Sequence, residues 1–405
     1  MTSILVVSEI FYPEGGGAEK ATYLILRHLV QHNFKITVIT GTKNPAKMSG
    51  VEYYVTSYLL HSNRLTKLTH LKLLANNLSF MKLLQEHDIL YIPLYACSPL
   101  ISLAKKKGLR VVVHLHNYMP VRYSSIKYFF EPDAIGTLDE FKLAVFHEYY
   151  TQKSLLRTLS MPLSFSAYLL SKRQIVEADK LICVSLRQAE IVAKSNPRLT
   201  NKIEVIYNPL PPELISDEPR KEPADIPTFL YVGGDSFVKG FPLLLHAINY
   251  IGKQDVKARF ILAGSYRARS LNILRRLKKI HKRLDIQVIG KVSFSDLAKA
   301  YKVAWVLVFP SIVEEPLPYA VFESSLLATI PIAPNLGGVK EILGGTTGEK
   351  YMFDSRDLKS MLGILDIIVS RDPHDIIEDG MKLRSSVLSR FKNAESLNKL
   401  LRVLS

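Results

Sequence analysis

The sequence predicts an α/β fold with two doubly wound domains, each built on a parallel sheet. Short runs rich in Val and Ile alternate with amphipathic stretches in both halves of the chain, as successive βαβ units require. A proline-rich segment between the halves interrupts this alternation. The length of 405 residues suits two domains of ordinary size, each able to bury its own core.

The first half is predicted to be an N-terminal domain, residues 1–208, with six buried parallel strands. Each candidate strand is short and almost continuously apolar, which is typical of a sheet covered on both faces. The candidates are residues 4–8, 35–39, 89–92, 110–114, 180–184 and 203–206.

Residues 209–227 contain six prolines and several acids, which predicts an exposed linker. The alternation then restarts in a predicted C-terminal domain, residues 228–384. A helical tail, residues 385–405, is expected to pack back on the N-terminal domain. The candidate strands of the second domain are residues 228–232, 258–263, 286–289, 305–309 and 330–333.

The chain carries a net charge of +16, from 53 Lys and Arg against 37 Asp and Glu. This excess favours an anionic partner, namely nucleic acid, anionic lipid or a phosphorylated substrate, although a basic surface also serves solubility alone. The sequence lacks a helix-turn-helix, zinc-finger or RNA-binding motif, so we expect no nucleic acid partner. Two cysteines, Cys97 and Cys183, are too few for a disulfide framework and favour a reducing setting.

No signal peptide or membrane span is expected. Residues 1–3 lack a basic region and the apolar run that follows is too short for a leader. The nearest candidate for a span, residues 155–170, contains Arg157 and several Ser and Thr. We therefore expect a cytoplasmic protein, peripheral on the inner face of a membrane where it binds one.

The strongest functional pattern lies in residues 310–323. Pro316 and Pro318 prevent a helix from starting earlier, so Glu315 lies in a loop at the carboxyl end of a strand. Pro318 suits the first position of the next helix, whose N–H groups can hold a diphosphate. Glu323, just over one turn into that helix, can reach a ribose. The alternative is a solvated helix residue, which its apolar neighbours disfavour.

This stretch resembles the glycosyl-group-1 family of retaining glycosyltransferases, which have the GT-B fold with two Rossmann-like domains that face a cleft. The family pattern has two glutamates separated by seven residues, as Glu315 and Glu323 are, and then Gly-Gly before a third glutamate, here Gly337-Gly338 and Glu341. Other segments follow the family order and extend the resemblance through most of the chain: residues 13–19, 184–185, 207–209, 231–234, 239–240, 262–264 and 288–292.

The resemblance implies a site for a nucleotide-sugar donor in the second domain. Glu315 would contact the donor sugar, and Lys239 would neutralise charge on the leaving diphosphate, where a cation is physically needed. Glu323 would bind the nucleotide ribose. The remaining donor contacts would come from Gly234, Leu317, Pro318, Tyr319, Ala320 and Val292.

By the same resemblance, a histidine of the first domain contacts the donor sugar and counts among the catalytic residues. Strand alternation puts His114 and His116 on one face, and we favour His116 because it lies nearer the carboxyl end of its strand. A structural histidine is the alternative. Asn117, beside it, is predicted to lie on the acceptor side of the cleft.

The opening glycine-rich loop is also predicted to lie on the acceptor side. It is not a G-x-G-x-x-G dinucleotide fingerprint, and no acid at the right distance supports one. Gly16 and Gly17 would instead let the backbone approach the donor phosphate or the acceptor. Glu19 would help to shape that face.

No metal site and no cofactor are expected, apart from the nucleotide-sugar as co-substrate. The sequence has no Asp-x-Asp and no Cys/His cluster with the spacing of metal ligands, so protein cations and helix dipoles would replace the ion. Two positions depart from the family. Asp235 follows Gly234 where an arginine is usual, so the leaving group would be stabilised either by Lys239 alone or by Arg267 from the next loop. Thr329 replaces a glycine.

The leading interpretation is an enzyme that moves a hexose from a nucleotide-sugar to a glycan or lipid-linked acceptor with retained anomeric configuration. The alternative is a protein of the same fold that binds a nucleotide-sugar without turnover, which the missing arginine motivates. Basic segments at residues 64–84, 105–107 and 267–283 suggest peripheral membrane docking. They are equally explained as helices that pack on their own sheet with a solvated basic face.

Overall fold

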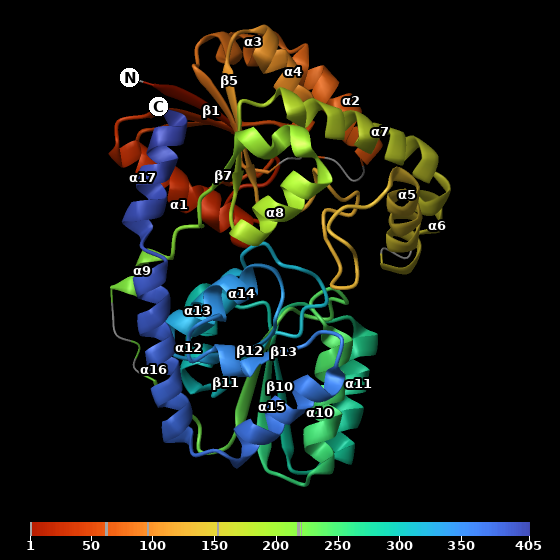
Figure 1. Ribbon diagram of the computed structural model, residues 1–405, viewed down its shortest axis with the longest axis vertical. Coiled ribbons are helices and arrows are strands. Elements are labelled where there is room, and N and C mark those ends of the chain that lie inside the picture. Colours follow the sequence, from red (N-terminus) through yellow and green to blue (C-terminus); the bar gives the residue numbers. More distant parts are fainter. Residues whose placement is uncertain (1, 61–63, 95–96, 152–153, 217–218, 220) are drawn as a thin grey trace. The chain divides into compact units, whose positions relative to one another are not determined.

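The computed structural model describes the chain except residues 1, 61–63, 95–96, 152–153, 217–218 and 220. The described residues form two compact units, Met1–Pro209 with Asn393–Ser405, and Leu210–Lys392 (Figure 1). Each unit is an α/β fold on one parallel sheet, which confirms the predicted fold class. No helix in this described part combines the length and apolar character needed to cross a membrane.

The first unit is built on a seven-stranded sheet in the order β3-β2-β1-β4-β5-β6-β7. Five of its strands are nearly continuously buried and coincide with predicted runs. The sequence pattern misses β3 because this edge strand has only exposed and half-buried side chains. The strands are β1 (Ser3–Ser8), β2 (Lys35–Thr40), β3 (Val51–Val55), β4 (Ile89–Ile92), β5 (Arg110–Leu115), β6 (Lys180–Cys183) and β7 (Ile203–Val205).

Alternate strand residues build a separate core on each face of this sheet. Leu5 and Val7 belong to one core, with apolar side chains from α2 (Arg64–Ala75), α3 (Leu78–Gln85), α4 (Pro99–Lys106) and α8 (Leu186–Ser195). Ile4 and Val6 belong to the other, with α1 (Gly17–Gln31) and α17 (Asn393–Leu404). The period of two in the sequence therefore assigns each strand side chain to one of two helical layers.

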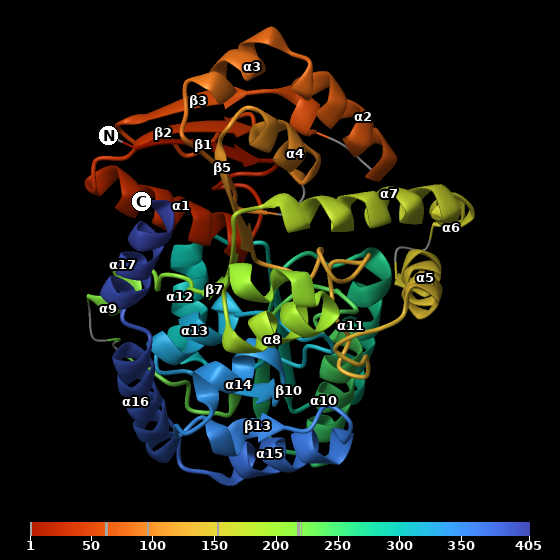
Figure 2. The same cartoon turned by 45° about the horizontal axis from the view of Figure 1, so that its top comes forward.

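A helical segment is inserted between β5 and β6. It consists of α5 (Thr137–Phe146), a π-helical turn η3 (His147–Thr151), α6 (Leu155–Leu159) and α7 (Met161–Gln174). It has a small core of its own, made by Tyr123, Ala144, Met161, Phe165 and Tyr168. α7 packs on α2 and α4 and runs outward from the sheet with α6 at its far end (Figure 2).

The second unit is built on a six-stranded sheet in the order β10-β9-β8-β11-β12-β13. The first five coincide with predicted runs, and the two-residue β13 is too short for a sequence pattern. The strands are β8 (Thr228–Val232), β9 (Ala258–Ala263), β10 (Leu284–Gly290), β11 (Val306–Val308), β12 (Ile330–Pro334) and β13 (Met352–Phe353).

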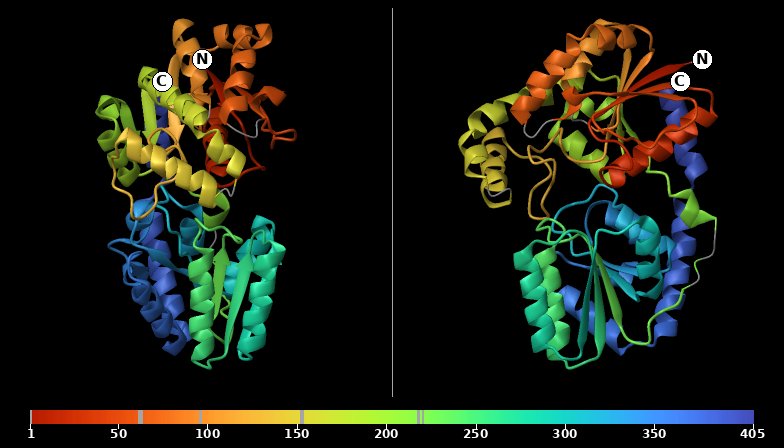
Figure 3. Two further views of the ribbon diagram at one scale, coloured as in Figure 1. Left: turned by 90° about the vertical axis from the view of Figure 1, so that its right-hand side faces the viewer. Right: turned by 180° about the vertical axis from the view of Figure 1, so that it is seen from behind.

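Helices cover both faces of the second sheet (Figure 3). On one face, α10 (Phe241–Lys253) contacts α11 (Ala268–Ile280) and α15 (Leu358–Ser370). On the other, α13 (Tyr319–Leu326) contacts α14 (Gly337–Leu343) and α16 (Pro373–Arg390), while α12 (Phe294–Val303) lies against β8. Short 3-10 turns complete the described structure: η1 (Ser57–Leu59), η4 (Ile175–Glu177), η5 (Pro197–Lys202) and η6 (Glu349–Tyr351).

The helical tail is broken where the sequence suggests one continuous helix. α16 ends at Arg390 and α17 begins at Asn393. Phe391 lies between them with non-helical backbone angles, and its ring packs edge-on against Phe322 at 4.8 Å between centroids. α17 then contributes Leu400, Val403 and Leu404 to the core of the first unit.

The proline-rich segment differs from the exposed linker that its composition suggests. Its helix α9 (Pro212–Ile215) buries Leu214, and Arg384 donates hydrogen bonds to the carbonyls of Leu214 and Ile215. The Lys221 ammonium donates to Tyr301 O, Ala304 O and Thr329 Oγ1 at 2.5–2.6 Å. The prolines therefore set an irregular path along the second unit rather than a free tether.

Candidate active site

Lys239 and Glu315, two predicted catalytic residues, form an ion pair at the carboxyl edge of the second sheet. The distance from Lys239 Nζ to Glu315 Oε1 is 2.6 Å. Lys239 precedes α10 and Glu315 follows β11, and the parallel neighbours β8 and β11 bring both loops to one edge. The side chains are 38% and 18% exposed, so the pair is accessible to a ligand.

The loop that carries Glu315 rests on the glycine pair at the start of α14. Gly338 N–H donates to Glu315 O at 2.9 Å. A Cβ at position 338 would lie 2.0 Å from Pro316 O, a distance that backbone atoms do not tolerate. The Gly-Gly pair is thus required for a close approach that fixes the position of Glu315.

The glycine loop after β8 packs on the loop after β9. Gly234 has φ +60°, and a Cβ there would lie 2.4 Å from Ser265 O. Asp235 follows, and its Oδ2 accepts hydrogen bonds from Arg267 N at 2.9 Å and Ser270 Oγ at 2.8 Å. These contacts attach the first turn of α11 to the glycine loop.

Asp235, which stands where the resembling family usually has an arginine, therefore has a structural role of its own. Partial burial raises the pKa of Asp235, but the Arg267 N–H, the Ser270 hydroxyl and the Arg267 charge outweigh burial and lower it below its ordinary value. Asp235 stays ionised and keeps the exposed Arg267 beside the glycine loop. Sequence reasoning raised Arg267 as a substitute cation but missed the carboxylate that positions it, because Asp235 and the start of α11 are distant in the sequence.

The start of α13 follows Glu315 directly. Leu317, Pro318 and Tyr319 are buried and Ala320 is half-buried. Pro318 is the N-cap and not the first helical residue, a shift of one position from the sequence expectation. No side chain caps this end within the described residues, and the first turn of a helix leaves N–H groups available for an anion.

Glu323 is buried, with 9% of its surface exposed, in the middle of α13. Its charge contributes, after burial, to raising the pKa of both Tyr301 and Tyr319, so its carboxylate lies near both phenols. Tyr301 Oη in turn donates to Ala320 O at 3.3 Å. Glu323 is therefore enclosed among aromatic side chains and is not a solvated helix residue.

Val292 is half-buried in the loop after β10. Gly290 O accepts a hydrogen bond from Gly264 N at 2.7 Å, which joins this loop to the loop after β9. The loops with Gly234, Lys239, Glu315 and Val292 thus all leave the carboxyl edge of one parallel sheet, the usual place for a ligand in such folds.

The predicted residues of the first unit lie at the carboxyl edge of its own sheet, after β1 and β5. Gly16 is the N-cap of α1 and Gly17 its first residue, both exposed. Glu19 Oε2 accepts a hydrogen bond from Gly16 N at 2.6 Å. Glu19 is therefore part of a helix cap. Its role on an acceptor face stays a prediction.

His116 stacks on His114, with 4.4 Å between ring centroids. Tyr91 Oη and His114 Nδ1 are 2.6 Å apart, which joins the histidine pair to the core. Burial lowers the pKa of His116 to about 3, so its imidazole is neutral at physiological pH. His116 Nε2 is buried and has no hydrogen-bond partner among the described residues.

Asn117 shapes the loop after His116. Its Oδ1 accepts from Met119 N at 2.9 Å, and its main-chain oxygen accepts from Gln188 Nε2 at 3.0 Å. Gln188 Oε1 also accepts from Val184 N at 2.8 Å. Sequence reasoning did not identify Gln188, which holds this loop against the end of β6.

Within the described residues, no group of three or more His, Cys, Asp or Glu could hold a metal ion.

Solved structures with the same two-domain architecture are glycosyltransferase structures, so the fold is GT-B. Sucrose-phosphate synthase from Thermosynechococcus elongatus has a TM-score of 0.74 and 15% identity, over 100% of this chain and 98% of that chain. Anabaena HepE in complex with UDP and glucose has a TM-score of 0.69 and 15% identity, over 100% and 99%. The E. coli trehalose-6-phosphate structure bound with UDP-2-fluoro glucose has a TM-score of 0.68 and 13% identity, over 100% and 99%.

Two family models match the chain. The Glycosyl transferases group 1 model matches residues 226–366, and the Glycosyltransferase Family 4 model matches residues 15–214. Together they cover most of the chain, one in each unit. The protein belongs to the group 1 glycosyltransferases, as its sequence motifs predicted, and it is a glycosyltransferase of the GT-B fold.

One curated relative shares part of the sequence. The gpi3 subunit of phosphatidylinositol N-acetylglucosaminyltransferase from Schizosaccharomyces pombe is 25% identical over 177 residues. The match spans 43% of this chain and 38% of that protein's length.

Proposed function

We propose that the protein transfers a hexose from a nucleotide-sugar donor to a glycan or lipid-linked acceptor, with retained anomeric configuration. The observation that carries the proposal is the Lys239–Glu315 pair, at 2.6 Å, next to a helix whose buried Glu323 lies eight positions further on. A cation, a helix N-terminus and a buried carboxylate, which we propose binds the ribose, thus lie within one short part of the second unit.

The donor diphosphate would bind at the start of α13 and beside Lys239. The bond between the anomeric carbon and the diphosphate oxygen breaks, the acceptor oxygen bonds to that carbon, and the acceptor proton passes to the leaving diphosphate. Lys239 and Arg267 stabilise the negative charge that develops. We propose that these cations and the α13 dipole act without a metal ion. Glu315 contacts the donor sugar.

The relatives suggest the chemistry of the two substrates. Anabaena HepE was crystallised with UDP-glucose, which makes UDP-sugars the first donors to test. The name of the S. pombe relative describes a sugar transferred to phosphatidylinositol. A lipid-linked acceptor at the cytoplasmic face of a membrane is therefore the acceptor class we favour.

A second candidate is a protein that binds a nucleotide-sugar without turnover. Asp235, in place of the usual arginine, favours it because the glycine loop carries one cation fewer. An assay of the purified chain with UDP-, GDP- and ADP-sugars distinguishes between the two candidate functions. Release of nucleoside diphosphate, with retained configuration in the product by proton NMR, supports the enzyme. Binding with no release by any donor supports the second candidate.

A further inference from the structure

Exposed apolar side chains are concentrated in the helical insertion of the first unit. α6 has no buried residue at all, and Leu155, Leu156 and Leu159 are 64%, 78% and 73% exposed. On α7, Leu163 and Leu170 also point to solvent, at 64% and 51%. We call these five leucines the leucine face. An apolar group of this size at one place on a protein is typical of a binding surface.

Aromatic side chains adjoin the leucine face in the sequence and in the insertion. Phe146, Tyr149 and Tyr150 are 39%, 50% and 61% exposed. They contact one another, with 4.9 Å between the ring centroids of Phe146 and Tyr150 and 4.8 Å between those of Tyr149 and Tyr150. Exposed Tyr next to exposed Leu is the composition of a segment that lies at a lipid–water interface.

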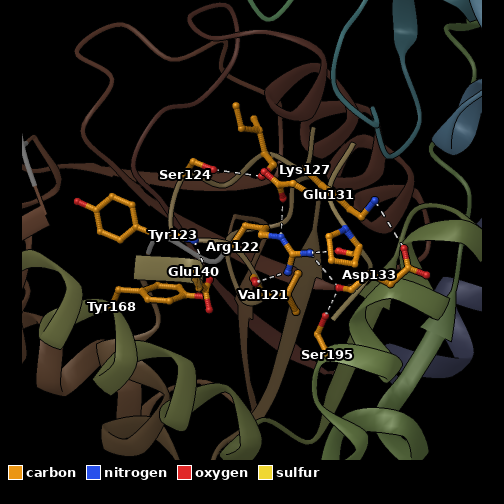
Figure 4. A network of polar contacts seen from close by, with 12 residues as sticks. Val121, Arg122, Tyr123, Ser124, Lys127, Glu131, Asp133, Glu140, Tyr168 and Ser195 are labelled. Carbon is orange, nitrogen blue, oxygen red and sulfur yellow. Dashed lines mark hydrogen bonds and ion pairs between the residues drawn. The ribbon is translucent and has the colours of Figure 1, made fainter. Parts of the chain in front are cut away.

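The leucine face stands on a well-packed base, so its exposure is not the result of a loose fold. Glu140 of α5 is buried and accepts hydrogen bonds from Tyr168 Oη at 2.5 Å and Tyr123 N at 3.1 Å. Arg122 Nε pairs with Glu131 at 2.8 Å in the buried loop nearby (Figure 4). Phe165 and Tyr168 fill the inner side of α7. The outward leucines are left for another partner.

The charge of the two helices that carry the leucine face distinguishes between the classes of partner. α6 and α7 contain three basic residues, Arg157, Lys172 and Arg173, and no acid, whereas the acids of the insertion, Asp139, Glu140 and Glu148, lie in α5 and η3. Arg157 and Arg173 are exposed. Basic side chains around apolar ones match an anionic lipid surface, where each contributes through the surface potential, whereas a symmetric contact with a second copy would bring these like charges together.

The basic segments singled out in the sequence lack such an apolar face. The apolar stripe of α11 packs inward through the buried Leu274, and Lys105 pairs with Asp179 at 2.7 Å. In α2, Leu71 and Leu74 are in the core. These elements use most of their apolar residues for the fold, and their exposed apolar side chains, Leu73, Leu78 and Ile280, are single residues on three different helices.

We infer that the leucine face, with the adjoining aromatic residues, docks the protein on the surface of an anionic bilayer. The leucines enter the boundary between headgroups and acyl chains, and Arg157 and Arg173 contact the phosphates. This inference deepens the proposed function, because a lipid-linked acceptor lies at such a surface. Its test, however, needs neither donor nor acceptor.

Vesicle flotation tests the inference with phosphatidylcholine vesicles and with vesicles that contain 30 mol% phosphatidylglycerol. The full chain should float with the anionic vesicles, and Leu156→Gln/Leu159→Gln/Leu163→Gln should lower the bound-to-free ratio at least tenfold. Leu73→Gln/Leu78→Gln, on exposed positions of α2 and α3, is the matched control and should change it less than twofold. Arg275→Gln/Arg276→Gln tests whether the basic surface of α11, and not the leucine face, binds the vesicles.

A second readout does not depend on multiple substitution. The Trp emission of the Leu156→Trp variant should shift to shorter wavelength when anionic vesicles are added, and it should not shift in buffer without vesicles. Equal flotation of the wild type and the triple variant, flotation of neither, or no emission shift would overturn the inference. So would a wild-type dimer by light scattering that the triple variant converts to a monomer without any vesicle binding. A chain that binds vesicles but transfers no sugar would refute the proposed function and would leave the inference of membrane docking intact.

Discussion

The side chains of the candidate site carry a nearly balanced charge, which makes Arg267 important. Glu315 neutralises Lys239 in the ion pair at 2.6 Å, and Asp235 adds another carboxylate at the glycine loop. A leaving diphosphate therefore needs a further positive charge. Asp235 accepts a hydrogen bond from Arg267 N at 2.9 Å, which holds the main chain of Arg267 beside the glycine loop, and we propose that Arg267 supplies this charge in place of the usual arginine.

Replacement of Arg267 by Ala should lower kcat/KM for transfer at least tenfold. A charged hydrogen bond to the leaving group contributes about 1.5–3 kcal/mol, which corresponds to roughly 10- to 150-fold in rate. Arg269→Ala, two positions along the same exposed helix start, is the control and should stay within twofold. Steady-state kinetics measure both, and equal rates for the two variants would remove Arg267 from the site.

At the scale of elements, the buried strands and the loops after them were predictable, because a parallel strand is a short apolar run and ligands meet its carboxyl end. The edge strand β3 was not, since its exposed side chains leave no apolar run. The path of residues 209–227 was not predictable either. Proline content indicates irregular backbone but does not tell whether Lys221 and Trp305 will hold that backbone on the domain.

The contact between α14 and the Glu315 loop gives a prediction at this scale. Gly338→Ala places a methyl group 2.0 Å from Pro316 O, so the loop must move and donor affinity should drop at least tenfold. Gly363→Ala in α15, where a Cβ meets nothing within 4 Å, should leave affinity unchanged and favour the helix by up to about 1 kcal/mol. Calorimetric titration and thermal unfolding of both variants check this. Unchanged affinity in Gly338→Ala would separate α14 from the site.

At the scale of the second unit, Lys221 links the proline-rich segment to the main body and should make stability depend on pH. Burial lowers the pKa of Lys221 to about 7 in the folded chain, whereas an unfolded lysine titrates near 10.4. Between these values the unfolded chain binds more protons, so the free energy of unfolding should rise as the pH rises from about 7 to 10.

The comparison with Lys221→Met isolates this contribution. Denaturant unfolding at pH 7, 8, 9 and 10 should show a stability gain in the wild type that the variant lacks. The readout is the difference in slope between the two proteins, because other groups titrate equally in both. Parallel pH profiles would show that Lys221 keeps its ordinary pKa and stays charged among its three oxygen partners.

At the scale of the whole molecule, the family could be predicted from motif order, whereas the roles of the donor residues stay predictions. Motifs did not show what each residue does in the fold. Glu19 caps α1 through the neighbouring Gly16, and Asp235 anchors α11 through a contact between loops that are distant in sequence. The leucine face escaped sequence reading for a similar reason: residues 155–170 looked only like an interrupted span, and exposure is a property of the folded insertion.

We propose that a nucleotide-sugar binds to the second unit around Lys239, Glu315 and Glu323. The most direct test is calorimetric titration with the nucleotide-sugar that gives the largest thermal shift, on the wild type, Glu323→Gln and Glu378→Gln. Glu378 is an exposed carboxylate of α16 and serves as the control. We expect at least a tenfold loss of affinity in Glu323→Gln and none in Glu378→Gln. Equal affinity in all three proteins would contradict this binding site.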